Sequence, residues 1–137
     1  MIAAHVYKNA LIAYLLGVPA VTALIGERLW DEMPQNPGRA AEAPISPWAF
    51  VGPIAATRIE PEMWQLRVRL YAASTKPGRD EAWTVMDALT DAIENSLLTL
   101  PAPYGQQQAA WIMLGGDVID PLNPKLVYCD ISAVVAG

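Results

Sequence analysis

The side chains that could carry out catalysis are few and far apart in this sequence. The only histidine, His5, lies in an apolar N-terminal stretch, and the only cysteine, Cys129, lies close to the C-terminus. Nucleophilic catalysis of the Ser-His-Asp or Cys-His kind needs a base within hydrogen-bond reach of the nucleophile. It would therefore depend on the fold bringing His5 to a distant partner. We expect His5 to be packed or solvent-facing, and Cys129 to be a small residue of the core.

Metal and phosphate chemistry has no better support in the sequence. Asp117, Asp120 and Asp130 carry ligands for a hard cation, but their spacing does not match the ligand order of a calcium loop. A single cysteine excludes both an internal disulfide and a cysteine-based zinc site, and the sequence has no glycine-rich phosphate loop. We expect no catalytic residue, no metal and no cofactor, and therefore a protein that is not an enzyme.

The tryptophans are the remaining residues with a recognised binding chemistry. There are five, namely Trp30, Trp48, Trp64, Trp83 and Trp111. Aromatic side chains can stack on the bases of a single-stranded nucleic acid, but such proteins surround them with a basic groove. This sequence has no basic run, and its net charge of −5 disfavours binding through neutralised phosphates. We expect the tryptophans to pack in the core or in an interface, without specific nucleic-acid binding.

Composition limits the size and state of the molecule. A chain of 137 residues makes one domain, residues 1–137, with a two-layer core. Hydrophobic residues make up 53% of the chain and charged residues only 17%, against about 25% charged in typical globular proteins. A monomer with this composition would cover itself poorly with polar surface. We expect a homo-oligomer or a component of a larger assembly.

The most regular segment is the strand predicted over Trp64–Tyr71. Its even-numbered residues, from Trp64 to Leu70, are apolar and share one face, while Arg67 and Arg69 lie on the other. Burial of each large apolar side chain is worth roughly 1.5 to 3 kcal/mol, which fixes the register of the strand. The two arginines must then find water or a partner.

An amphipathic helix is predicted over Arg79–Leu98. Its apolar stripe, at steps of three and four residues, consists of Ala82, Met86, Leu89, Ile93 and Leu97. The opposite side is acidic and carries Asp80, Asp87, Asp91 and Glu94. The Thr75–Gly78 turn precedes the helix, and we expect the prolines of Leu100–Pro103 to stop it.

The N-terminal segment predicts two short helices, Ile2–Leu16 and Pro19–Ile25. In the first, we expect Ile2, Val6, Ile12, Ala13 and Leu16 to form one packed stripe, with Tyr7, Leu11 and Tyr14 opposite. A signal peptide ending at Val21–Ala23 is the alternative, although Lys8 is the one firm positive charge before it. Gly17–Pro19 interrupts the apolar run, and each half is shorter than the ~20 residues of a membrane span. We expect no membrane association.

The other segments complete the predicted fold. Short strands are predicted over Arg28–Trp30, Trp48–Gly52, Ala109–Leu114 and Leu126–Val135, with turns at Gly115–Asp117 and Asp120–Pro124. Proline-rich Asp31–Pro47 reads as a long extended loop, which in a compact domain is often functional. The element order indicates an α+β fold, a largely antiparallel sheet with helices packed on one face. The C-terminal strands fall within residues 109–136.

Several of these segments together resemble a known protein family. They are the run Pro19–Trp30, the proline-rich loop after it, Pro47–Val51, the strand Gln65–Ala72 and the helix Asp80–Leu97. In this order they resemble the small tail-completion proteins of long-tailed bacteriophages, and in particular the tail terminators. The resemblance covers roughly residues 10–98 and contains no catalytic signature.

The resemblance implies a structural role in the virion. A tail terminator forms a closed hexameric ring on the last ring of the tail tube, stops polymerisation of the tube and presents its other face to the head. The implied partners are other copies of the chain, the tail tube protein and the head-tail connector or neck proteins, and DNA would pass through the ring. The implied location is the tail or neck of the virion, after assembly in the host cytoplasm.

Ring formation would give the charged faces a function. A closed ring places one surface of each subunit against a different surface of its neighbour. Arg67 and Arg69 would then meet Asp87, Asp91 or Glu94 of the next subunit's helix. The alternative is that both faces are simply solvated. The residues of the long loop that we expect to reach a neighbour are Asp31, Glu32, Met33, Pro34, Arg39 and Glu42.

Two other functions stay open at this point. A neck or connector protein also needs a ring of small subunits and leaves no catalytic trace in its sequence. A small α+β domain that binds a metabolite or a protein would use residues 31–47 as its binding loop. A stable monomer with a ligand-sized apolar pocket would favour this last function.

Overall fold

The computed structural model describes residues 2–33, 45–94, 96–118 and 125–137. It contains the helices α1 (Ala3–Leu15), α2 (Pro19–Ile25) and α3 (Asp80–Glu94). Its strands are β1 (Leu29–Trp30), β2 (Trp48–Glu60), β3 (Met63–Ser74), β4 (Gln107–Val118) and β5 (Lys125–Ala136).

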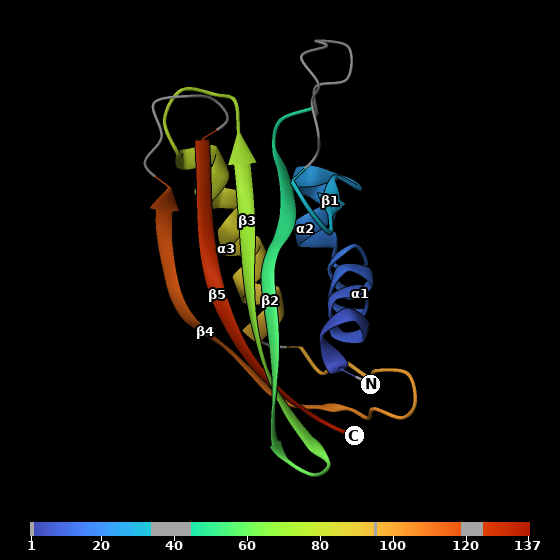
Figure 1. The fold of residues 1–137 in the computed structure, drawn as a ribbon. Helices are drawn as coiled ribbons and strands as arrows, with labels where there is room; N and C mark the ends of the chain where they lie inside the picture. The colour runs from blue at the N-terminus through green and yellow to red at the C-terminus, as the bar shows by residue number, and fades with distance from the viewer. Residues whose placement is uncertain (1, 34–44, 95, 119–124) are drawn as a thin grey trace.

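The five strands form one sheet in the order β1-β2-β3-β5-β4. The pairs β2–β3, β3–β5 and β5–β4 are antiparallel, and only the short β1 runs parallel to its neighbour β2. The helices pack on one face of this sheet, with α3 behind β3 and β5 and the pair α1 and α2 nearer to β2 (Figure 1). The prediction of an α+β fold with a largely antiparallel sheet is confirmed.

The core lies between the helices and the even-numbered face of β3. Trp64, Leu66, Val68 and Leu70 are all buried there, as the alternating pattern predicts. The odd-numbered residues of β5 continue this layer from Val127 to Val135. Cys129 lies in this row and is buried, so its interpretation as a small core residue is confirmed. Burial raises the pKa of its thiol to about 12.

Helix α1 buries a different stripe from the one expected. The buried residues are Ala3, Tyr7, Leu11 and Leu15, at strict four-residue spacing, whereas Ile2 is exposed. The stripe prediction was wrong because nearly all of this helix is apolar, so the pattern alone does not favour one side. A polar contact distinguishes the sides instead: the buried Tyr7 hydroxyl donates to Gln107 Oε1 at 2.7 Å.

Gln107 connects this contact to the segment that follows α3. Its side-chain amide donates to the hydroxyl of Ser96 at 3.0 Å and to the Ser96 carbonyl at 3.3 Å. Both ends of the buried amide are therefore satisfied, and burial raises the pKa of the Tyr7 phenol. The network fastens α1 to the start of β4.

Helix α3 ends at Glu94, four residues before the expected end at Leu98. The Ser96 hydroxyl and backbone N–H both donate to the carbonyl of Ile93, at 2.7 and 3.0 Å, which satisfies a carbonyl at the helix terminus. The chain then turns so that Leu98 and Leu100 enter the core. Leu97, predicted as the last buried position of the stripe, is instead 72% exposed.

Strands β2 and β4 are longer than expected. Strand β2 continues from Gly52 through Pro53 to Glu60 and forms a hairpin with β3, which projects beyond the other strands in Figure 1. Strand β4 includes Gly115–Asp117, so the predicted turn there is wrong. A Cβ at Gly116 would lie 2.9 Å from the Tyr128 hydroxyl oxygen, so this glycine gives the ring room to pack on the strand. The predicted turn at Asp120–Pro124 lies outside the described residues.

No single helix in the described part of the chain is long and apolar enough to cross a membrane. Helices α1 and α2 reach the length and apolar composition of a membrane span only when taken together, and the two are bent by 84° at the break between them.

The buried amide network predicts the effect of removing one hydroxyl. Tyr7→Phe leaves Gln107 Oε1 buried without its donor, which costs about 1 to 3 kcal/mol. Tyr14→Phe is the matched control, because the Tyr14 hydroxyl donates to the Ala92 carbonyl at a half-buried site that water can reach. We expect Tyr7→Phe to lower the free energy of unfolding in urea by clearly more than Tyr14→Phe. Equal losses would contradict a structural role for the network.

Candidate subunit interface on the open face of the sheet

The face of the sheet opposite the helices carries the charged residues of the central strand. Arg67, Arg69 and Tyr71 lie on this open face of β3, because they alternate with the buried positions. Residues paired across antiparallel strands point to the same side. Asp130 is paired with Arg69, and Tyr128 with Tyr71, so β5 contributes these two residues to the open face.

Arg69 and Asp130 form an ion pair within the chain. Arg69 Nε donates to Asp130 Oδ1 at 2.8 Å, and Arg69 Nη2 donates to Asp130 Oδ2 at 3.0 Å. The same guanidinium lies 4.2 Å from the centre of the Tyr128 ring. The hydrogen bonds to Asp130 raise the pKa of Arg69, so it carries its charge at every relevant pH. Arg69 therefore already has a carboxylate in its own subunit.

Arg67 differs from Arg69, because none of the described residues gives it a charged partner. It is paired in register with Ala55 on one side and Ser132 on the other. It is exposed, and it makes no ion pair within the described part of the chain. Asp87, Asp91 and Glu94 are also exposed, on the outer side of α3. Because α3 packs on the other face of the sheet, the fold keeps this acidic side away from Arg67 (Figure 1).

Apolar side chains flank the charges on the open face. Trp111, Met113 and Leu114 of β4 are 43%, 47% and 52% exposed. Met113 and Leu114 form one wall of a shallow groove, and Pro53 and Ala55 of β2 line it on the other side. Arg67 and the Arg69–Asp130 pair lie between the walls. The groove combines apolar walls with a charged floor and contains no nucleophile with a neighbouring base, so it is suited to binding.

A second, smaller cluster lies at one end of the open face. Trp48, Phe50 and Ala73 are buried there, apart from the main core. The rings of Phe50 and Tyr71 stack with their centroids 4.8 Å apart. A Cβ at Gly52 would lie 2.4 Å from the Tyr71 ring, so this position requires glycine. The cluster stiffens the end of the face on which Arg69 is held.

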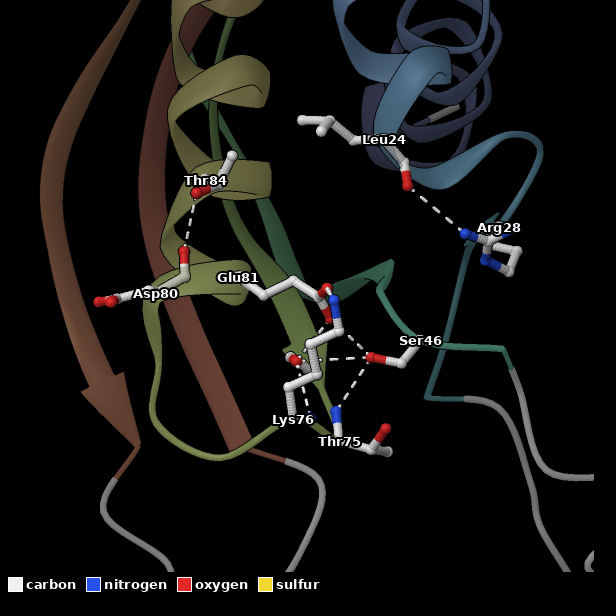
Figure 2. Close-up of polar contacts among 9 residues, drawn as sticks. Leu24, Arg28, Ser46, Thr75, Lys76, Asp80, Glu81 and Thr84 are labelled. Atoms are coloured by element: carbon white, nitrogen blue, oxygen red, sulfur yellow. Dashed lines mark hydrogen bonds and ion pairs between the residues drawn. The ribbon is translucent and has the colours of Figure 1, made fainter.

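Polar contacts fasten the start of α3 to the end of β3 (Figure 2). Glu81 Oε1 accepts hydrogen bonds from the hydroxyls of Ser46 at 2.8 Å and Ser74 at 2.7 Å. Lys76 Nζ lies 2.8 Å from Glu81 Oε2. The hydrogen bond from Lys76 and those from the serines lower the pKa of Glu81 against the effect of burial. Both hydroxyls donate to a carboxylate, so neither is activated as a nucleophile.

Arg28 holds the segment just before β2 in place. Its Nε donates to the carbonyl of Pro47 at 2.9 Å, and its Nη2 donates to the carbonyl of Leu24 at 3.4 Å. Figure 2 shows the contact with Leu24 beside the Glu81 cluster. The start of β2 is thus tied both to the end of α2 and to α3. The contact of Arg28 with Pro47 was not foreseen, because the sequence does not show that these two segments lie close together.

The expected assembly loop is described only at its start. Lys8 Nζ lies 3.2 Å from Asp31 Oδ2, which ties Asp31 to α1. Glu32 and Met33 are exposed. Pro34, Arg39 and Glu42 lie outside the described residues.

The remaining candidates for chemistry stay apart. His5 is solvent-facing on α1, and its Nε2 lies 3.5 Å from Asn9 Nδ2. Cys129 is buried on the core side of β5. Within the described ranges, no group of three or more histidine, cysteine, aspartate or glutamate side chains is placed to hold a metal ion.

The Glu81 cluster predicts a pH-dependent contribution to stability. Because the pKa of Glu81 is lowered by folding, its stabilisation is present above the unfolded value of about 4.3 and disappears as the pH falls below it. Glu81→Gln keeps acceptors for the two serines but loses the charge that faces Lys76. We expect it to lower the free energy of unfolding by about 1 kcal/mol at pH 7 and by less at pH 3. Glu62→Gln, at an exposed position in the turn between β2 and β3, is the control. A pH-independent loss in Glu81→Gln would contradict the charged role.

Comparison with solved structures identifies the fold of a virion component. One matching chain comes from a structure described as the virion of the native gene transfer agent (GTA) particle, with a TM-score of 0.79 and 17% sequence identity. The match covers 97% of this chain and 96% of that chain. At this level of identity the match establishes a common fold. A search of curated protein sequences found no match.

Comparison with family models shows to which protein family the chain is related. The model described as Tail completion protein gp17 matches residues 9–136, which is nearly the whole chain. The resemblance to tail-completion proteins inferred from the sequence is thereby confirmed. The chain is a structural protein of the virion tail and belongs to the family of tail completion protein gp17.

Proposed function

We propose that this protein is a tail terminator. Six copies form a closed ring that caps the tail tube, stops its polymerisation and provides the surface to which the head is joined. The family match supports the place of the ring in the tail. The observation that carries the proposal is the open face of the sheet, where Trp111, Met113 and Leu114 expose apolar surface that a monomer would leave in water.

The composition of the surface favours an assembly held by shape and apolar contact. Hydrophobic residues make up 53% of the chain, and several large ones are exposed on the described surface. The exposed large hydrophobic residues are Ile2, Met33, Ile45, Ile59, Leu97, Trp111, Met113 and Leu114. Interfaces of this kind act without turnover and need no cofactor, which fits the lack of a catalytic arrangement on the described open face.

A charge contact between subunits stays a prediction. Of the two arginines first considered, only Arg67 is now expected to make it. Because Arg69 is paired with Asp130, Arg67 is the open-face cation that would meet Asp87, Asp91 or Glu94 of a neighbour. This contact would join opposite faces of two subunits, a heterologous arrangement that can close into a ring. Exposed ion pairs are worth about 0 to 1 kcal/mol, so the contact would steer association more than hold the ring.

The ring would have different partners at its two ends. One end would contact the last ring of the tail tube protein, and the other would contact the connector or neck proteins of the head. DNA would pass through the centre without base-specific contacts. The segment that begins at Asp31 and Glu32 is our candidate for the arm that reaches a neighbour, because prolines reduce the entropy lost when an extended arm is ordered.

The ring state has a direct test. We expect the purified protein to have the mass of a hexamer by light scattering, to appear as rings in negative-stain images, and to halt growth when added to polymerising tube protein. Rings that leave tube growth unaffected but bind the head connector would reassign the protein to the neck. A stable monomer would contradict the ring and favour a small binding domain.

Charge reversal tests the steering contact. We expect Arg67→Glu to slow ring assembly at low salt, by up to about fivefold per contact, and to have no effect at high salt, where exposed charges are screened. The double variant Asn9→Asp with Ala20→Glu lowers the net charge by the same two units at exposed positions of α1 and α2, and serves as the matched control. Circular dichroism would verify that both variants fold. Identical assembly of Arg67→Glu and the wild type at low salt would reject the contact.

A further inference from the structure

The sheet ends at β4, a long edge strand with almost no charge along it. This strand has twelve residues and lies at the edge of the sheet, where β5 is its only described strand neighbour. Only its first residue is covered on the outer side, because the Gln107 N–H donates to the Leu98 carbonyl at 2.7 Å beside the Thr99–Gln106 bridge. Monomeric proteins usually protect such an edge with lysine, proline or inward-pointing charges. Strand β4 has no proline and no basic residue, and its only charged residue is Asp117, near its end. Two register irregularities, at Gln107–Ala109 and Ile112–Leu114, bend the strand but add no charge.

The opposite edge of the sheet is also partly free. Strand β1 covers only the start of β2, through the pairs Leu29–Ala49 and Trp30–Phe50. Beyond Pro53, the described residues place no strand beside the outer edge of β2. This free segment, residues 54–60, includes Ile59, which is 47% exposed. The strand order places β3 and β5 between this part of β2 and β4, so the two free segments lie at opposite edges of the sheet.

The two free edges have matching directions. Strand β4 is antiparallel to β5, β5 to β3, and β3 to β2, so β4 runs antiparallel to β2 of the same sheet. If a second copy is placed beside the first with the same face outward, its residues 54–60 run antiparallel to β4. The contact then continues the pairing already present inside each subunit.

The side chains along the two edges are compatible as well. From Gln107 to Gly116 strand β4 is uncharged, and Trp111 and Leu114 expose apolar surface on the open face. The facing segment of β2 has one charged residue before its last position, Arg58, whose guanidinium lies 4.8 Å from the centre of the Trp64 ring. The contact would bring Ile59 and Trp111 together, with Arg58 held against the Trp64 ring and Glu60 at the far end of the segment.

We propose that β4 of each subunit pairs with residues 54–60 of β2 in the next subunit, so that one antiparallel sheet continues around the ring. This inference rests on the proposed ring and gives an edge-to-edge contact that closes it. The open faces of neighbouring subunits then lie on the same side, so this arrangement is an alternative to the face-to-back contact of Arg67, and the variants below distinguish the two. The arrangement is heterologous, since two different edges meet, and closure of the ring leaves no free edge. The partner is a second copy of this chain, and the open face of the continued sheet is shared by all subunits.

Two complementary variants test the contact. Trp111→Lys places a charge on the β4 edge, and Ile59→Lys places one on the β2 edge. Each variant keeps one intact edge. We expect each alone to lose the ring and to sediment as a monomer, with each contact weakened at least about tenfold. An equimolar mixture is expected to form a heterodimer but no ring, because the intact β4 of Ile59→Lys fits the intact β2 of Trp111→Lys.

Leu97→Lys is the matched control, because Leu97 is 72% exposed and lies after α3, outside both edges. It is expected to keep the ring. Amide hydrogen exchange gives a second measurement: β4 and residues 54–60 should both exchange more slowly in the wild-type ring than in either monomeric variant. Protection of both edges supports the proposal even if one lysine variant fails to fold.

The other outcomes show whether the edge contact or the ring itself is wrong. If Ile59→Lys remains a dimer while Trp111→Lys is a monomer, two β4 strands pair about a twofold axis and the proposal is wrong. If both variants keep the ring, the edge contact is wrong and the terminator function stands. If Arg67→Glu abolishes the ring while both edge variants keep it, the subunits join face to back. A monomeric wild type would overturn the proposed function itself.

Discussion

The alternation of side chains along β3 is the constraint on which the rest of the structure depends. This strand lies at the centre of the sheet, with β2 on one side and β5 on the other. Its apolar residues from Trp64 to Leu70 are buried on one face, and a shift of one residue would place Arg67 and Arg69 in the core instead. The three helices cover the apolar face. The other face is left open, and it is there that the molecule has surface to offer a partner.

The open face is organised for contact. Arg69 is neutralised by Asp130 and supported by Tyr128, so the floor of the groove is fixed before any partner arrives. Preformed surfaces of this kind lose little entropy on binding. The residues capable of chemistry are elsewhere: His5 faces solvent on α1, and Cys129 is buried in the core. The Arg69–Asp130 pair makes the open face rigid, and Trp111, Met113 and Leu114 expose apolar surface on the same face.

Much of the fold was predictable because strand and helix periods are local properties of the sequence. Three local patterns predicted their elements correctly: the alternation of side chains in β3 and β5, the amphipathic pattern of α3, and the glycine that ends α2. The errors have a common origin in long-range contacts. Helix α3 ends early because Ser96 satisfies the Ile93 carbonyl, α1 buries Tyr7 because Gln107 accepts its hydroxyl, and Gly116 lies in a strand because Tyr128 packs on it. The Arg69–Asp130 pair was missed for the same reason, since no single segment of the sequence shows which strands are neighbours in the sheet. The family resemblance was recognisable from ordered elements, whereas the two free sheet edges required the structure.

The most direct test of the terminator function is to inactivate this gene in its source genome and to image the particles by negative-stain electron microscopy. A missing terminator leaves nothing to stop the tube protein, so we predict overlong tubes without attached heads. Restoring the gene should restore tails of uniform length joined to heads. Particles of normal length that carry heads in the absence of the gene would contradict the account, and tails of normal length that fail to join heads would contradict the terminator role.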